Sequence, residues 1–304
     1  IQKNINKAKK NGAEVVVLLS HNGFDVDQKL ASILDNVDVI LTGHTHDAIP
    51  RAIKIKNTLL LSSGSHGKYL GRIDLKVDNG KVVDFSSNLI PIFSDVIQPD
   101  PEMTRLIDKI REPYEEECNR VVGEAETLLY RRGNFGGPWD SVICDAIIQE
   151  RDTEISLSPG FRWGTTLLPG QKITIDDIYS QTSMNYPEVY RTEMNGETIK
   201  NLLEDVCDNI FNPDPFFQQG GDMVRVGGMT YTCQPKETMG NRISDLKLSN
   251  GEKIESQKNY TIGGWGSINP EVEGPPIYKL LEDYVSGEKI IKPKHNNPVK
   301  IKGI

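Results

Sequence analysis

Short apolar runs alternate with amphipathic helical patterns through the first hundred residues or so of the chain. The strands predicted from these runs are residues 14–20, 38–42, 58–63 and 71–77. The first, residues 14–20, is a continuous apolar run, which is typical of a strand buried on both faces. A helix pattern over residues 27–35 lies between the first strand and the second. The alternation of strand and helix predicts an α/β layer sandwich.

A proline-containing stretch over residues 97–103 interrupts this pattern. The residues that follow, 103–119, form a charged amphipathic helix pattern with an expected break near Pro113. We therefore predict a first domain over residues 1–95, a connecting helix over 96–122 and a second domain over 123–304.

The second domain has a different pattern, in which helices and strands mix without regular alternation. The predicted helices are residues 138–150, 195–211 and 277–285, and the predicted strands are residues 153–158, 223–231, 242–248 and 260–265. Asn195 stands where an N-cap is expected for the second of these helices. The second domain is therefore expected to be a mixed α+β unit.

The composition narrows the function classes. The chain has 35 basic and 43 acidic residues, giving a formal net charge of −8. That balance argues against a protein that binds nucleic acid or acidic membranes. No apolar run approaches the roughly 20 residues that a membrane helix needs. The four cysteines contain no C-x-x-C pair, so a cysteine zinc site is not expected. Cys144 and Cys207 fall on apolar helix positions and are predicted to be buried thiols.

The chain starts within a helix pattern, because Ile1, Ile5 and Ala8 share one helical face. There is no initiating methionine and no signal peptide pattern. We expect from this that the sequence is a fragment whose N-terminal part is missing.

Three histidines follow the first two predicted strands. His21 lies in "LLSHNG", and His44 and His46 lie in "LTGHTHD". Open α/β sheets bind their ligands at the carboxyl ends of the strands, and imidazole is a common ligand of divalent transition metals. Gly43, beside the His-x-His pair, is expected to supply the backbone freedom that turns both rings one way. The spacing therefore predicts a metal site.

The segments "VVVLLSHNG" and "VDVILTGHTHD" resemble the last two metal-binding motifs of calcineurin-like metallophosphoesterases of the 5′-nucleotidase type. This resemblance implies two divalent metal ions, with manganese the expected metal and His21, His44 and His46 as ligands. His66 matches no ligand of the family. The family's earlier aspartate-containing motifs are absent from these residues. Three neutral imidazoles cannot neutralise two dications, so we expect the chain to hold only half of the site and to be inactive unaided.

Segments of the second domain carry a resemblance to a more specific family, and that resemblance extends over most of the chain. The segments "LLYRRGNFGGPWD", "SLSPGFRWGTTLLPGQKIT" and "LEDVCDNIFNPDPFFQQGGDMVRVGGMTY" resemble the SoxB-type thiosulfohydrolases, over a span from Ala13 to about Tyr284. The implied fold is the C-terminal part of a four-layer metallophosphoesterase sandwich followed by a mixed α+β 5′-nucleotidase C-terminal domain. The implied activity is periplasmic release of sulfate from a cysteine S-thiosulfonate on a SoxYZ-like carrier protein. No residue of the chain is assigned a catalytic role.

Arginines of the second domain are the candidates for binding the sulfonate oxygens, because a guanidinium group can hold two oxygens at once. Arg162 is the first choice, since "SPGFRWG" places it in a loop directly after a strand. Arg225 and either Arg131 or Arg132 come second, and each arginine could instead form a structural ion pair. Trp163 could wall the site or pack in the core.

Phe216 and Phe217 could stack on a nucleotide base, as aromatics of this region do in nucleotidases, or pack beneath a long loop. Trp265, in "GGWGS", could lie in a tight turn or beside a ligand. Three functions stay open: a SoxB-like thiosulfohydrolase, a 5′-nucleotidase or cyclic-nucleotide phosphodiesterase, and a non-catalytic anion-binding module. The product released, sulfate or phosphate, separates the first two.

Overall fold

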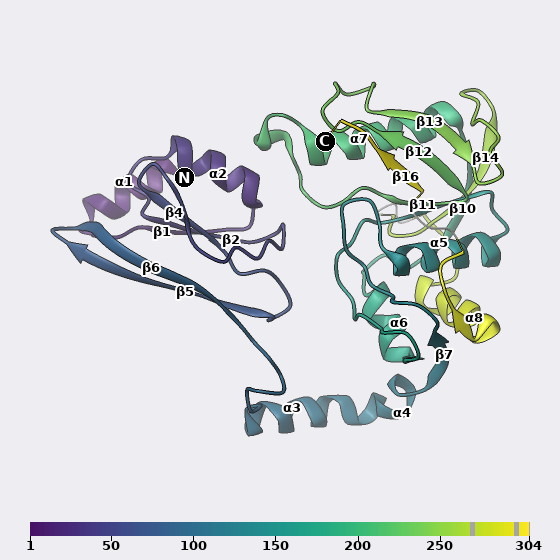
Figure 1. Cartoon of the computed structure of the whole chain (residues 1–304), viewed down its shortest axis with the longest axis horizontal. Coiled ribbons are helices and arrows are strands. Elements are labelled where there is room, and N and C mark those ends of the chain that lie inside the picture. Colours follow the sequence, from purple (N-terminus) through teal and green to yellow (C-terminus); the bar gives the residue numbers. More distant parts are fainter. Residues whose placement is uncertain (268–270, 295–297, 304) are drawn as a thin grey trace. The chain divides into compact units, whose positions relative to one another are not determined.

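The computed structural model describes residues 1–267, 271–294 and 298–303 and divides into two compact units. Unit 1 comprises Ile1–Asp108 together with Asp214–Gly220, and unit 2 comprises Lys109–Pro213 together with Gly221–Ile304. The division after Asp108 falls inside the segment predicted to connect the two domains. The short segment 214–220 interrupts unit 2 in the sequence and counts with unit 1. Both units mix helices with several sheets, as the predicted fold class requires (Figure 1).

Unit 1 is built on a four-stranded sheet in the order β1-β2-β4-β3. Its strands are β1 (Val17–Ser20), β2 (Val39–Thr42), β3 (Ile53–Ile55) and β4 (Thr58–Ser62). The first, second and fourth are parallel, and β3 runs antiparallel to β4. The helices α1 (Gln2–Lys10) and α2 (Phe24–Ile33) cover one face, and the hairpin of β5 (Tyr69–Asp78) and β6 (Lys81–Pro91) covers the other (Figure 1).

The central strands of this sheet, β2 and β4, are buried on both faces. Ile40 and Leu60 pack against the helices, whereas Val39 and Leu59 pack towards the hairpin. The prediction of two-sided burial is wrong for the first strand. β1 forms the edge of the described sheet, and Leu19 is 82% exposed there.

Two strands of unit 1 were not predicted, β3 and β6. None of the residues of β6 is fully buried, so its pattern carries no burial signal. The strand is held by its pairing with β5 across the predicted Asn79-Gly80 turn. Both turn residues have positive φ, 48° and 70°, which matches the twist that a two-residue hairpin needs.

The connecting helix has the predicted break. It consists of α3 (Pro101–Arg111), a 3-10 turn η1 (Glu112–Tyr114) and α4 (Glu115–Cys118). Pro113 lies in the 3-10 turn, where its missing N–H and fixed φ prevent a continuous α-helix.

Unit 2 contains three sheets, in the orders β10-β14-β8-β11, β13-β12-β16 and β15-β7-β9. The strands are β7 (Val121–Ala125), β8 (Ile155–Ser158), β9 (Lys172–Thr174), β10 (Tyr190–Asn195), β11 (Arg225–Gly227), β12 (Met229–Cys233), β13 (Ile243–Leu248), β14 (Asn259–Gly264), β15 (Ile290–Ile291) and β16 (Val299–Ile301). The helices are α5 (Pro138–Arg151), α6 (Ile175–Thr182), α7 (Gly196–Phe211) and α8 (Ile277–Glu288), with a 3-10 turn, η2 (Pro215–Phe217), in the segment that counts with unit 1.

The four-stranded sheet of unit 2 separates two apolar cores. Helix α5 contributes Trp139, Ile143 and Ile147 to one core, and α7 contributes Ile199 and Leu203 to the other. The predicted N-cap of α7 is confirmed, because the Asn195 side chain accepts a 2.8 Å hydrogen bond from the Thr198 N–H. Cys144 and Cys207 are both buried, as predicted, and Cys207 lies in the second of these cores.

The strand predicted over residues 223–231 is divided between two sheets. β11 pairs with β8, whereas β12 pairs with β13 and β16. Gly228 lies between them with φ +73°, and a Cβ there would collide with the Glu154 carbonyl. The chain therefore turns from one sheet to the other at a residue that must be glycine. In the described part of the chain, none of the helices is both long and apolar enough to cross a membrane.

Candidate functional site

The histidines of unit 1 gather at one edge of its sheet. His21 follows β1, His44 and His46 follow β2, and His66 follows β4. Because these strands are parallel, their carboxyl ends lie at the same edge. The imidazole of His21 lies 5.2 Å from that of His44, and the imidazole of His46 lies 5.7 Å from that of His66, measured between ring centroids.

A buried hydrogen bond holds the turn that carries His21. The Ser20 hydroxyl donates to the Asp27 carboxylate at 2.7 Å, and Asp27 on α2 is fully buried. The Asn22 side-chain amide donates to the same Ser20 oxygen at 2.8 Å. The residues on either side of His21 are thus tied together, which fixes the direction in which the chain leaves β1.

The backbone after β2 differs from the prediction. His44 and His46 themselves have positive φ, 76° and 60°, whereas Gly43 does not. The expectation that Gly43 supplies the backbone freedom is therefore wrong. A Cβ at Gly43 would lie 3.0 Å from the His21 ring, so the glycine allows the two loops to approach closely. Non-glycine residues at positive φ are strained, and such residues cluster at functional sites.

The donor set determines whether these histidines fit the metal pair that the resemblance implies. His21 and His44 are close enough together to serve one ion. Over residues 1–267, 271–294 and 298–303, however, no group of three or more His, Cys, Asp or Glu side chains is arranged to hold a metal ion. The donors present do not fit a two-metal site, and the ligand roles of His21, His44 and His46 stay predictions.

The segment 214–220 packs on His44 and on α2. The Lys29 ammonium pairs with Asp214 and lies 4.2 Å from the centre of the Phe216 ring. The Lys29 hydrogen bond and the Phe216 N–H hold the pKa of Asp214 below its usual range. The His44 Nε2 atom lies 3.1 Å from the Gln219 carbonyl oxygen. A carbonyl oxygen can only accept, so Nε2 is the donor in this contact.

Four of the five candidate substrate residues lie in or beside a buried network in unit 2, and the fifth, Arg132, is exposed to solvent. Arg225 is 1% exposed and donates to Asp222 at 2.9 Å and to the Gly133 carbonyl at 2.9 Å. Arg131 is 3% exposed and donates to Asp140 at 2.8 Å. Arg225 and Asp140 are also paired, at 3.4 Å.

Arg162 lies at the more open end of this network. Its Nε is 2.9 Å from an Asp222 oxygen, and its Nη2 donates to the Gly221 carbonyl at 3.0 Å. The Arg162 side chain is 20% exposed, whereas that of Arg225 is 1% exposed. Burial raises the pKa of Asp222 above its usual range, although the positive charges of Arg225 and Arg162 oppose the shift. The ion-pair alternative thus describes Arg131, Arg162 and Arg225 in this structure.

The aromatic candidates have different surroundings. Trp163 is half-buried and stacks on Phe161, with ring centroids 3.7 Å apart. Trp265 is 3% exposed and donates to the Ser158 hydroxyl at 2.8 Å, and Gly266 follows it with φ +75°. The tight turn beside a packed tryptophan is therefore confirmed. In unit 1, the η2 aromatics Phe216 and Phe217 are 45% and 67% exposed, so the packing alternative is wrong for Phe217.

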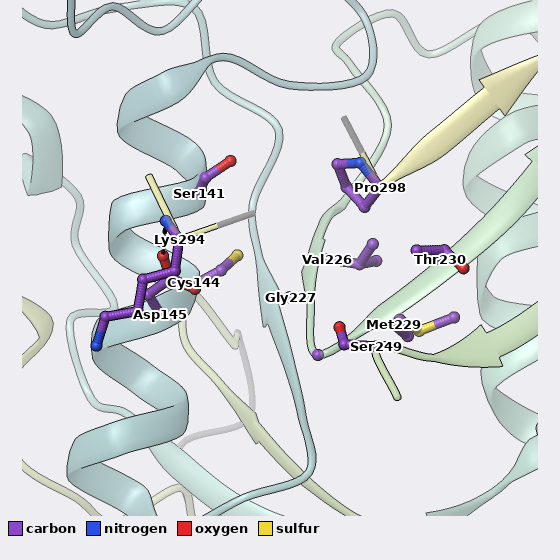
Figure 2. Close-up of a pocket in the computed structure, with 11 residues that line it drawn as sticks. Ser141, Cys144, Asp145, Val226, Gly227, Met229, Thr230, Ser249, Lys294 and Pro298 are labelled. Carbon is purple, nitrogen blue, oxygen red and sulfur yellow. Dashed lines mark hydrogen bonds between the residues drawn. The ribbon is translucent and has the colours of Figure 1, made fainter. Parts of the chain in front are cut away.

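A pocket of unit 2 is lined by other residues than the predicted site residues, although Val226, the neighbour of Arg225 on β11, is among them. It has a volume of about 270 Å³ and opens between α5 and the strands β11 and β12 (Figure 2). Ser141, Cys144 and Asp145 line it from the helix, and Val226 and Met229 line it from the strands. Burial raises the pKa of the Cys144 thiol to about 12, so this sulfur is a poor nucleophile near neutral pH.

Sequence reasoning missed the residues that hold the candidates in place. Gln219 and Gly220 approach His44 from 175 or more positions away, and the spacing carries no signal for that contact. Asp140 and Asp222 are the buried partners of the arginines. Asp222 lies directly after Gly220-Gly221, but a carboxylate beside a turn is also common on a protein surface.

Sequence comparisons find similarity to nucleotidases and phosphoesterases. Residues 121–267 match the family described as the 5′-nucleotidase C-terminal domain. The chain is 26% identical over 253 residues to the trifunctional nucleotide phosphoesterase YfkN of Bacillus subtilis, a match that covers 79% of this chain and 17% of YfkN. Another match, 37% identical over 70 residues, covers 23% of this chain and 15% of the uncharacterized metallophosphoesterase YunD of the same organism.

Solved structures give similar results. The sulfate thiohydrolase SoxB of Thermus thermophilus, in complex with glycerol, has a TM-score of 0.95 and 33% identity, covering 100% of this chain and 57% of SoxB. A 5′-nucleotidase precursor, also of Thermus thermophilus, has a TM-score of 0.82 and 18% identity, covering 100% of this chain and 67% of that one, and shows the fold alone. The chain thus spans little more than half of SoxB and about a sixth of YfkN.

The buried pair Arg131–Asp140 gives a first prediction. Arg131→Met should destabilise unit 2 by roughly 3–5 kcal/mol, because it leaves Asp140 buried with one partner fewer. The measurement is urea unfolding followed by tryptophan fluorescence, which reports on unit 2 alone because Trp139, Trp163 and Trp265 all lie there. Lys279→Met removes an exposed ion pair with Asp283 in the same unit and should leave the transition unchanged. Equal effects of the two changes would contradict the role of the network.

A second prediction uses two neighbouring glycines. Gly220 and Gly221 both have positive φ, +74° and +87°, but only at Gly220 would a Cβ meet His44, at 2.5 Å from Nε2. Gly220→Ala should therefore push the imidazole away from the Gln219 carbonyl, whereas Gly221→Ala adds only the same backbone strain. The readout is the His44 imidazole cross peak in a proton–carbon NMR spectrum, assigned with His44→Gln. A shift of equal size in both variants would show that backbone strain moves the ring.

Proposed function

Because the chain belongs to the 5′-nucleotidase superfamily and has a SoxB-like structure, we propose that it serves a SoxB-type hydrolysis. The substrate would be a cysteine S-thiosulfonate on a SoxYZ-like carrier protein, and the product would be sulfate. The observation that carries this proposal is the match to SoxB, which extends over the whole chain with a TM-score of 0.95 and 33% identity. The match to the 5′-nucleotidase precursor has the same coverage but only 18% identity.

The chemistry of the two substrate classes is closely related. A sulfonate and a phosphate ester both present tetrahedral groups with negatively charged oxygens, and both are cleaved by water. In the proposed reaction, the water oxygen bonds to the sulfonate sulfur and the sulfur–sulfur bond breaks. Its electron pair and one proton of the water go to the carrier sulfur, which leaves as a cysteine persulfide, and sulfate and the second proton are released. Metal ions supply a polarised water in hydrolases of this kind, with manganese the metal we propose. The name of YunD, a metallophosphoesterase, supports metal dependence.

Among the arginine candidates, we propose Arg162 for substrate contact. Arg131 and Arg225 are almost entirely buried, and their guanidinium groups face carboxylates and carbonyls. Arg162 keeps 20% of its side chain exposed while Asp222 and the Gly221 carbonyl fix the plane of its guanidinium group. A fixed, partly exposed fork is suited to binding two oxygens of one anion. Arg132 is exposed and Trp163 half-buried, and both stay secondary candidates.

A nucleotidase or cyclic-nucleotide phosphodiesterase is the second candidate function. The match to YfkN covers 79% of this chain, and YfkN is a nucleotide phosphoesterase. Phe216 and Phe217 expose enough ring surface to stack on a base. A non-catalytic anion-binding module is the third candidate, since the described donors do not complete a metal pair. Location in the periplasm belongs to the SoxB-type proposal.

The products released decide between these functions. The gene product that contains these residues should release sulfate from the carrier-bound thiosulfonate in the presence of Mn²⁺, at least about tenfold more efficiently than it releases phosphate from AMP. His44→Ala should lower sulfate release roughly a hundredfold or more and should lower the bound metal, whereas His66→Ala should change both only a few-fold. A preference for AMP would establish the nucleotidase function, and release of neither product would favour the binding module.

A last prediction of the proposed function concerns Arg162. Arg162→Lys keeps the charge but loses the planar fork, and one charge-assisted hydrogen bond is worth roughly 1.5–3 kcal/mol. The efficiency of sulfate release should therefore fall about tenfold or more, with the bound metal unchanged. Arg191→Lys is the matched control, because Arg191 is exposed in the same unit and is not a candidate for substrate binding. Unchanged sulfate release in Arg162→Lys would remove this residue from the substrate site.

A further inference from the structure

Two of the four cysteines meet in the core of unit 2 although they lie 26 positions apart. Cys207 is on α7, Cys233 is the last residue of β12, and their Sγ atoms are 3.7 Å apart. Both side chains are fully buried. Cys118 is partly exposed at the end of α4, and Cys144 lies on α5 beside the pocket of Figure 2.

The contact is already close to the geometry of a covalent bond. A disulfide has an S–S length of about 2.05 Å, so the two sulfurs need to approach by roughly 1.7 Å. Cys207 and Cys233 belong to the same apolar cluster, in which α7 packs against the sheets of unit 2. The approach therefore requires side-chain rotation within elements that are already in place.

The two sulfurs also differ in acidity. The hydrogen bond between them lowers the pKa of Cys233 and raises the pKa of Cys207, while burial acts to raise both. Cys144, which is equally buried, has its pKa raised to about 12 by burial. Cys233 is thus the thiol that ionises more readily, and a thiolate is the species that attacks a disulfide.

We propose that Cys207 and Cys233 are oxidised to a disulfide that joins α7 to β12. The oxidant is a disulfide of a small thiol or of a thiol oxidoreductase. The thiolate of one cysteine attacks one sulfur of the oxidant and releases one thiol, and the other cysteine then attacks the mixed disulfide at the protein sulfur and releases the second. Two protein thiols and one oxidant disulfide thereby give one protein disulfide and two free thiols. Because both sulfurs are buried in the folded unit, the exchange takes place while the chain folds.

The bond would close a loop that contains residues of both candidate sites. The segment between the two cysteines contains Gln219 and Gly220, which approach His44, and also Asp222 and Arg225 of the arginine network. The cross-link would tie together the two ends of this segment. This inference does not depend on the proposed reaction, although an oxidising compartment such as the periplasm would favour the bond.

The test uses the gene product refolded in a mixture of oxidised and reduced glutathione. The protein is denatured and treated with N-ethylmaleimide without reductant, and its peptides are then mapped by mass spectrometry. We expect one linked peptide pair containing Cys207 and Cys233, with Cys118 and Cys144 alkylated as internal controls. Alkylation of all four cysteines, or a link through Cys118 or Cys144, would overturn the proposal.

A thermal measurement provides a second readout. Closing a loop of about 25 residues stabilises a domain of this size enough that a reductant should lower its Tm by roughly 5–10 °C. In Cys207→Ala the Tm should not respond to the reductant, whereas in Cys118→Ala it should respond as in the unmodified protein. The same response in Cys207→Ala would contradict the proposal. If Cys207→Ala does not fold, the peptide map of the unmodified protein still decides the question.

Discussion

The pairing of buried charges constrains unit 2 more than any other interaction. Two buried carboxylates, Asp140 and Asp222, lie among three guanidinium groups, of which those of Arg131 and Arg225 are buried and that of Arg162 is partly exposed. A buried charge without a partner is very costly, so the segments that carry these residues cannot separate without exposing or orphaning a charge. Glycines make the approach possible, because a Cβ at Gly137 or Gly160 would collide with the backbone of a neighbouring segment.

This constraint would allow one network to stabilise unit 2 and, in the proposed function, to orient Arg162 towards the substrate. Arg131 and Arg225 use their donors on carboxylates and backbone carbonyls of the fold. Arg162 shares Asp222 with Arg225 but remains partly exposed. The inner arginines thus hold the carboxylate, and the carboxylate orients the outer arginine. A guanidinium group held in this way loses little side-chain entropy when it binds an anion.

In unit 1 the corresponding constraint is the parallel order of the strands. Parallel strands place their carboxyl ends at one edge, which brings His21, His44, His46 and His66 together from three loops. The positive φ of His44 and His46, the Ser20–Asp27 bond and the approach of segment 214–220 then set the direction of individual rings. The proposed sulfonate and phosphate substrates would place similar demands on such a site, and the chain is similar both to SoxB and to a nucleotide phosphoesterase.

The sequence by itself determined the features that depend on a few neighbouring residues. The apolar runs predict β2 and β4, Pro113 predicts the break between α3 and α4, and Asn195 predicts the start of α7. The order of strand and helix and the histidine motifs predict the fold class. Hydrogen bonds within a turn and the periodicity of burial are local, so they can be recognised without knowledge of the tertiary structure.

Only the tertiary structure decided which residues, far apart in the sequence, lie close together. The exposure of β1, the burial of Arg131 and Arg225, the contact between His44 and Gln219 and the meeting of Cys207 with Cys233 all depend on segments far apart in the chain. Whether an arginine is exposed or buried in an ion pair depends on which carboxylate is buried together with it. That choice belongs to the packing of whole elements, and no local spacing records it.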